Sequence, residues 1–221
     1  MSTPRSNLAV AAIVGQLVFV GGWLVLGLLE GRGYAPGRHD ISDLGALTAQ
    51  HATIDRLTLF VSGAVTIAFA LSLRADLGRP AWLVALSLPG LDGLSDAFFR
   101  VDCRAADPGC GFADATDSWH GTVHVVVFVA AALATVGAPF VLARRMRRAD
   151  GWQGLAGGTR IFGGLTVAAL GVTMLSSGTA LQGWTQRGAA VLVASGIVML
   201  AWHVVRLERR TPRGDTVSVV P

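Results

Sequence analysis

The chain has 221 residues, of which 52% are hydrophobic and only 14% charged, and its formal net charge is +4. A soluble domain averages about 25% charged residues, so this composition excludes an ordinary water-soluble protein and indicates one that lipid covers. The basic residues are all arginines that gather at the ends of apolar runs, and they form no continuous basic face for nucleic acid. We therefore expect the lipid bilayer, and no nucleic acid, as a partner.

The first apolar run, residues 8–29, contains no charged residue. As a helix it would extend about 33 Å, enough to cross the apolar core of a bilayer. A secretory signal is the alternative, but its apolar core has only about 7–15 residues and ends at small residues. This run is longer and ends in Leu-Leu-Glu, so we predict a retained transmembrane helix.

Further apolar runs predict an all-α, polytopic membrane protein, a six-transmembrane-helix bundle in which residues 1–211 form a single domain. The predicted spans are about 8–29, 57–73, 80–99, 119–143, 161–181 and 188–205. Six spans place both termini on one side, together with most of the arginines. The positive-inside rule then predicts a protein of the cell membrane with cytoplasmic N- and C-termini. Residues 212–221 are expected to form a disordered cytoplasmic tail.

Polar residues concentrate between residues 92 and 124. Asp92 and Asp96 lie four apart inside the third predicted span, and His120 and His124 repeat this spacing at the start of the fourth. Residues four apart share one helix face, and ionisable residues inside a span usually face the bundle interior and mark function. Together these four side chains suit a divalent metal such as zinc, a proton relay or a plain hydrogen-bonded network. We favour the network over the metal, because nothing in the sequence fixes the rotation of the two helices.

An outward-facing polar pocket is expected where the second, third and fourth spans end. Its predicted residues are Asp92, Asp96, Asp102, His120, His124, His51 and Asp55. Ser42 and Asp43, in the first outer loop, are the candidate catalytic residues. The plain alternative for this loop and for the start of the second span is a capped interfacial helix with solvated charges.

Both cysteines, Cys103 and Cys110, lie in the second predicted outer loop. An extracytoplasmic compartment oxidises thiols, so we expect a disulfide between them, with Pro108 and Gly109 in the turn that it closes. Two free thiols are the alternative. A zinc pair fits less well, since structural zinc sites place two to four residues between cysteines.

The loop motifs resemble those of a bacterial and archaeal membrane family catalogued as domain of unknown function 998. The resemblance rests on Tyr34, Pro36 and the run from Ile41 to Ala46, and more loosely on Gly93 to Phe99, Asp102-Cys103, Gly109-Cys110 and His120. It implies an integral membrane protein with polar positions on one side and assigns no role to any residue. Alkaline ceramidase-like hydrolases share the His-x-x-x-His element, but they have one more span and a different spacing.

These observations favour a non-enzymatic membrane protein that binds or senses a small molecule or lipid at the polar pocket. The alternative is a metal-dependent hydrolase that acts on a lipid or envelope precursor. Asp92, Asp96, His120 and His124 would hold its metal, and a metal-bound water becomes a nucleophile near neutral pH. A transporter ranks third, because the sequence lacks the paired broken helices of many transporters.

Overall fold

The computed structural model describes residues 3–31 and 33–210, and it is all-helical, with no strand among these residues. The long helices are α1 (Pro4–Leu29), α2 (Ala52–Ser72), α7 (Trp119–Met146), α8 (Ala156–Leu175) and α9 (Gln182–Arg210). Short helices extend two of them, α3 (Arg74–Leu77) after α2 and η4 (Gln153–Leu155) before α8. Within the described ranges, the five resulting helices are long and apolar enough to cross a membrane. The predicted all-α membrane class is therefore confirmed.

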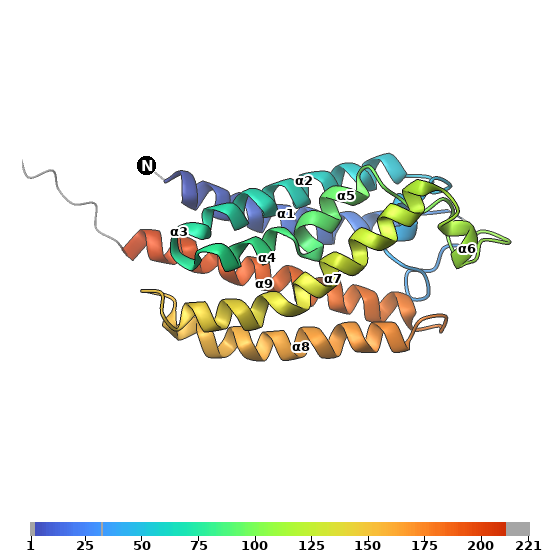
Figure 1. Ribbon diagram of the computed structural model, residues 1–221. Coiled ribbons are helices and arrows are strands. Elements are labelled where there is room, and N and C mark those ends of the chain that lie inside the picture. Colours follow the sequence, from blue (N-terminus) through green and yellow to red (C-terminus); the bar gives the residue numbers. More distant parts are fainter. Residues whose placement is uncertain (1–2, 32, 211–221) are drawn as a thin grey trace, which may run out of the picture.

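The long helices run side by side along one direction (Figure 1). We call the end that holds the start of α1 and the end of α9 the terminal end. The opposite end, which we call the loop end, holds residues 30–31, 33–51, 97–118 and 176–181 (Figure 1). α1 packs against α2 and α9, while α8 packs against α7 and α9. Both ends of the described chain therefore lie at the terminal end.

The third predicted span, residues 80–99, is not one continuous helix. The chain there forms η2 (Arg79–Ala81), α4 (Trp82–Ala85), η3 (Leu88–Asp92) and α5 (Gly93–Asp96). The prediction of a continuous third span is therefore wrong. The broken segment, as we call residues 79–96, still runs from the terminal end to the loop end (Figure 1) and packs against α2 and α7.

Pro89 explains the position of the break. A proline inside a helix removes one backbone hydrogen bond, and its ring clashes with the carbonyl four residues earlier, here that of Ala85. The amide of Leu88, which the break exposes, donates to Thr135 Oγ1 on α7 at 2.8 Å. A neighbouring helix thus satisfies the freed backbone group, as a membrane interior requires.

Gly63 allows α2 to approach the broken segment. A Cβ at this position would lie 2.4 Å from the backbone nitrogen of Leu94 and 2.9 Å from the carbonyl oxygen of Gly90. On the other side of α2, Gln16 of α1 donates to Thr66 Oγ1 at 2.9 Å. Backbone contact on one side and a buried hydrogen bond on the other fix α2 between its neighbours.

A polar clamp closes the terminal end of the bundle. Asp76 forms an ion pair with Arg5 and accepts a hydrogen bond of 2.9 Å from Trp152 Nε1. The Trp152 ring is fully buried and belongs to an apolar core that includes Phe69 and Met146. The clamp joins the start of α1 to the turns after α2 and α7.

Two predicted boundaries differ from the structure. α2 begins at Ala52 and not near residue 57, so that Asp55 lies in its first turn. α8 ends at Leu175 and not near residue 181, and the turn after it contains Gly178 with φ of +75°. The predicted disordered tail, residues 212–221, lies outside the described residues.

Candidate functional site

Asp96 and His124 form a direct pair at the loop end. Asp96 is the last residue of α5 and His124 lies in the second turn of α7. His124 Nδ1 donates to Asp96 Oδ1 at 2.8 Å, and the two side chains retain 10% and 14% exposure. Two of the four predicted metal-ligating residues therefore meet, and they form a hydrogen-bonded pair that is slightly exposed.

Asp92 lies deeper, at the end of η3. It is 8% exposed, and its Oδ1 has no hydrogen-bond partner among the described residues. It interacts electrostatically with Asp96, which follows it by one turn. A buried carboxylate oxygen without a donor is costly, so Asp92 is a strong candidate for a functional residue.

Asp55, Asp43 and Glu30 extend this acidic group toward the loop end. All three are buried, and each has one carboxylate oxygen without a hydrogen-bond partner in the described part of the chain. Asp55 interacts electrostatically with both Asp96 and Glu30. Its Oδ2 lies under η1 (Ser42–Gly45), only 3.0 Å from where a Cβ on Gly45 would stand. We call Glu30, Asp43, Asp55, Asp92 and Asp96 the carboxylate cluster.

The loop after the broken segment brings an arginine to this cluster. Arg104 Nη1 donates to Glu30 Oε1 at 2.6 Å, and its Nη2 donates to Asp107 Oδ1 at 2.6 Å. Arg104 directly follows Cys103, which forms the predicted disulfide with Cys110. The disulfide prediction is therefore confirmed, and the short closed loop presents Arg104 to Glu30.

The candidate catalytic residues Ser42 and Asp43 begin η1. Ala105 N donates to Asp43 Oδ1 at 3.3 Å, while Ser42 is half-buried beside it. Burial raises the pKa of Asp43 to about 7, partly offset by the amide of Ala105. Asp43 can therefore bind or release a proton near neutral pH.

The remaining predicted pocket residues, Asp102, His120 and His51, form hydrogen bonds that stabilise the loops and the start of α2. Asp102 accepts hydrogen bonds from Ser118 N and Oγ, at 2.8 and 2.7 Å, which hold its pKa below the usual value. His120 Nδ1 donates to the carbonyl oxygen of Phe98 at 3.2 Å. The carbonyl of His51 accepts the amides that start α2. The hydrogen bonds of these three residues are thus made with backbone or loop groups and not with the carboxylate cluster.

No group of three or more His, Cys, Asp or Glu side chains in residues 3–31 and 33–210 is arranged to hold a metal ion. The expected quartet is split, because His124 meets Asp96 whereas His120 turns to a backbone carbonyl. A metal there would need His120 and Asp92 to join the existing pair.

Aromatic rings line the loop end beside the Asp96–His124 pair. Phe98 stacks edge-on with Phe60 at 6.0 Å between centroids, and Phe99 does the same with Trp119 at 5.1 Å. Phe98 and Trp119 are 55% and 61% exposed. We call these four rings the aromatic rim. Phe99 and Trp119 also pack against the ring of His120, at 5.8 and 4.8 Å between centroids. Phe98 and Phe99 follow Asp96 closely in the chain, so the rim lies at the same end of the broken segment as the Asp96–His124 pair.

Arg187 of α9 stabilises the fold of the loop end, and it is not among the residues that the sequence pattern singles out. It is buried and donates to the carbonyl oxygens of Pro36 and His39 and to the hydroxyl of Tyr34. These bonds hold the first loop across the start of α9. Arg104 and Glu30 were also missed. Their positions in the sequence could have indicated them, because Glu30 directly follows an apolar run and Arg104 directly follows Cys103.

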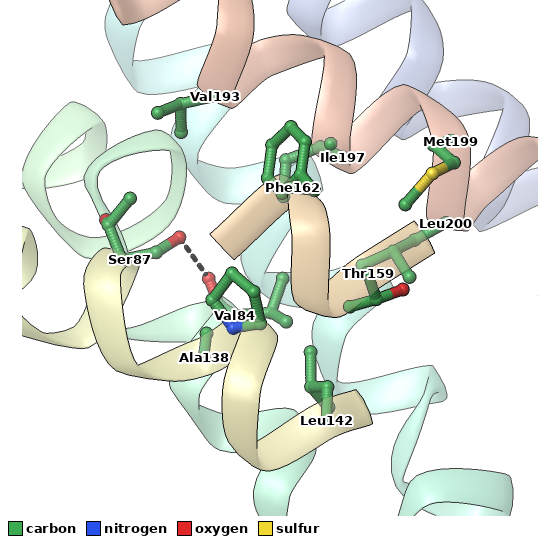
Figure 2. A pocket seen from close by; sticks show the side chains of 13 residues that line it. Val84, Ser87, Ala138, Leu142, Thr159, Phe162, Val193, Ile197, Met199 and Leu200 are labelled. Atoms are coloured by element: carbon green, nitrogen blue, oxygen red, sulfur yellow. Dashed lines mark hydrogen bonds between the residues drawn. The ribbon is translucent and has the colours of Figure 1, made fainter. Parts of the chain in front are cut away.

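A small cavity of about 50 Å³ lies beside the break in the broken segment, with Val84 and Ser87 in its wall (Figure 2). α4, α7, α8 and α9 line it, almost entirely with apolar side chains such as Leu142 and Phe162. Three hydroxyl groups line it, and each has a partner. Ser87 donates to the Val84 carbonyl at 2.7 Å, Thr135 to the Ala131 carbonyl at 2.8 Å and Thr159 to Met146 Sδ at 3.4 Å.

The family model described as "Protein of unknown function (DUF998)" matches residues 13–216. No curated protein and no solved structure matches the chain.

Proposed function

Because the chain belongs to the DUF998 family, whose description states no activity, we propose a function from the site alone. The protein binds or senses a lipid or an amphipathic small molecule at the loop end. The polar part of the ligand meets the Asp96–His124 pair, and its apolar part lies against the aromatic rim.

The observation that carries this proposal is the set of buried carboxylate oxygens without partners. Glu30, Asp43, Asp55 and Asp92 each hold one such oxygen. Buried polar groups are normally hydrogen-bonded, and each exception needs an explanation. A merely structural network would satisfy these oxygens. Arrangements that cost stability are typical of functional sites.

The aromatic rim supports an amphipathic ligand. Phe60, Phe98 and Trp119 are each at least 40% exposed. Asp96, two residues before Phe98, has a side chain that is 14% exposed, and it is the most exposed member of the carboxylate cluster. The indole of Trp119 is typical of the boundary between apolar and polar phases, and the Phe rings offer apolar surface. A molecule with a polar head and an apolar tail matches both surfaces at once.

We also propose that the loop end faces outward from the cell membrane and that both termini are cytoplasmic. Arginines of the N-terminus and of the α7–α8 turn lie toward the terminal end, as the positive-inside rule requires of a cytoplasmic face. The Cys103–Cys110 disulfide lies at the opposite end, and disulfides persist in oxidising compartments.

Titration of the detergent-purified full chain with short-chain phospholipids, one with a phosphocholine head and one with a phosphoglycerol head, tests ligand binding. We expect a saturable rise in melting temperature that needs about tenfold more lipid in Asp96→Asn and in Phe98→Ala, equivalent to about 1.4 kcal/mol. Phe128→Ala is the matched control, because Phe128 is 40% exposed on α7 away from the rim. Equal titrations for all variants would mean that lipid acts only as solvent, and the proposal would fail.

The alternative of a metal-dependent hydrolase is tested by metal analysis of the purified chain. Zinc or another divalent ion at one per chain, lost in both His120→Ala and His124→Ala, would favour the hydrolase. Binding of lipid without such a metal would favour the binding protein.

A further inference from the structure

We propose that residues 103–110, which we call the strap, form a redox-sensitive cover over Glu30 and Asp43, and that a dithiol reductant opens it. The Cys103–Cys110 disulfide closes the strap into a loop. This inference concerns access to two members of the carboxylate cluster. It goes beyond the lipid binding proposed above and does not depend on it.

The strap covers Glu30 through the side chain of Arg104. Arg104 Nη1 donates to Glu30 Oε1 at 2.6 Å, and the side chain of Glu30 is fully buried. Arg104 is in turn held inside the strap, since its Nε and Nη2 donate to Asp107 Oδ1 at 3.0 and 2.6 Å. The position of the cation that covers Glu30 therefore depends on the fold of the strap.

The strap covers Asp43 through its backbone. Ala105 N donates to Asp43 Oδ1 at 3.3 Å, and Asp43 is only 5% exposed. The carbonyl oxygen of Ala106 lies 3.1 Å from where a Cβ on Gly33 would stand, so the strap lies directly on the backbone of the first loop. Within the described chain, an open strap would leave Asp43 without a donor.

Without the disulfide, hydrogen bonds alone keep the strap closed. Thr48 Oγ1 of the first loop accepts from Arg104 N at 3.1 Å and donates to Asp107 Oδ2. Each such bond adds little net stability, and Arg104 and Glu30 regain hydration when they separate. A cross-link, in contrast, removes much of the conformational freedom of the opened chain. Reduction should therefore shift the strap toward its open form.

The disulfide lies where a reductant can reach it. Both cysteines are half-buried, and they line an open hollow of about 460 Å³ whose wall includes the exposed residues Pro108 and Gly109. Thiol–disulfide exchange requires such access to the sulfur atoms. The chain has only these two cysteines, so a reductant can act on no other disulfide within it.

The exchange transfers two electrons from the dithiol to the Cys103–Cys110 bond. A thiolate of the reductant attacks one sulfur, which forms a mixed disulfide and releases the other cysteine as a thiolate. The second thiol of the reductant loses its proton and attacks the mixed disulfide, which releases the second cysteine and leaves the reductant as a disulfide. The two cysteine thiolates take up the two protons that the dithiol has lost. A reduced Cys-x-x-Cys pair of a thiol–disulfide oxidoreductase belongs to this class of reductant.

Limited trypsin digestion of the detergent-purified full chain, with and without dithiothreitol, tests the proposal. Trypsin cleaves after arginine, and Arg104 in the closed strap is only 9% exposed. Reduction should speed cleavage after Arg104 by about tenfold or more, because proteolysis follows the population of the open form. Carbodiimide labelling of Glu30 and Asp43, measured by peptide mass spectrometry, should rise with it. Arg38 is the internal control, since it is exposed in the first loop outside the strap, and its cleavage should keep the same rate.

The double variant Cys103→Ser/Cys110→Ser should show the fast cleavage both with and without dithiothreitol. If it does not fold, the native chain still decides, because its bond is reduced after folding. A bond that dithiothreitol leaves intact, or unchanged cleavage after Arg104 in the reduced protein, would overturn the proposal. An equal rise at Arg38 would overturn it too, because reduction would then loosen the loop end as a whole. No lipid is titrated, so failure of the strap and failure of the ligand site are distinguishable.

Discussion

At the residue scale, the protein buries several charged side chains, which costs free energy unless they are paired. Asp43 accepts one backbone hydrogen bond, yet its other oxygen is buried without a partner. Arg187, by contrast, is buried with partners on several sides and fastens the first loop. Arg187 is therefore a residue that stabilises the fold, whereas the unpartnered oxygen of Asp43 makes it a candidate functional residue.

The pH dependence of stability should reveal Asp43. Its pKa is raised from 3.8 to about 7 in the folded state by burial. Between these values the folded chain binds a proton that the unfolded chain has lost, so stability falls as pH rises from about 4 to about 7. Melting temperatures across this window should fall less steeply in Asp43→Asn than in the native protein. An equal slope in both would show that the Asp43 carboxyl titrates normally.

At the scale of elements, the broken segment decides how the site is built. It delivers Asp92 and Asp96 on consecutive turns and turns Asp96 toward α7. The sequence predicts the apolar character of this stretch and the spacing of its two acids. It does not predict the break, because prolines also occur in continuous membrane helices whose neighbours satisfy the freed backbone groups. Here the group that accepts from the freed amide, Thr135 on α7, is distant from Pro89 in the sequence.

Substitution of Gly63 tests the packing of the broken segment. In Gly63→Ala the new Cβ would meet backbone atoms of Leu94 and Gly90, which can yield only if the segment shifts. We expect a loss of about 2 kcal/mol of stability, typical of an overpacked core. Gly164→Ala is the control, since nothing lies within 4 Å of that position on α8. Equal melting temperatures for the two variants would contradict the close contact.

The disulfide loop is the second element that the site requires. Removal of the bond in Cys103→Ser/Cys110→Ser should lower the free energy of unfolding by about 2 kcal/mol, because the seven-residue separation closes a short loop. Arg104 should then lose its hold on Glu30. A thiol-reactive reagent should label the native protein only after reduction. Labelling without reductant would contradict the bond.

At the scale of the whole molecule, the two ends of the bundle differ in kind. The terminal end is clamped by Asp76, which has both an ionic and a neutral partner. Toward the loop end lies the carboxylate cluster, in which four carboxylate oxygens have no partner in the described chain. The difference matches a bundle whose terminal end provides stability and whose loop end provides function.

The sequence predicts this layout only in part. Hydrophobic runs, the cysteine pair and the acid and histidine spacings indicate the helices, the disulfide and the region of the site. His120 and His124 show the limit, because the start of α7 gives one histidine to Asp96 and the other to a backbone carbonyl. Which residue of a spaced pair faces the cluster depends on helix rotation, which tertiary packing sets.

The most direct measurement is the melting temperature of Asp55→Asn in a single detergent, beside that of Asp76→Asn. Asp55 is 1% exposed with an oxygen that lacks a partner. If the carboxylate cluster is kept for function, Asp55→Asn melts at the native temperature or above it, while Asp76→Asn melts several degrees lower. If Asp55→Asn loses as much stability as Asp76→Asn, the cluster is a structural network and the site proposed for it is contradicted.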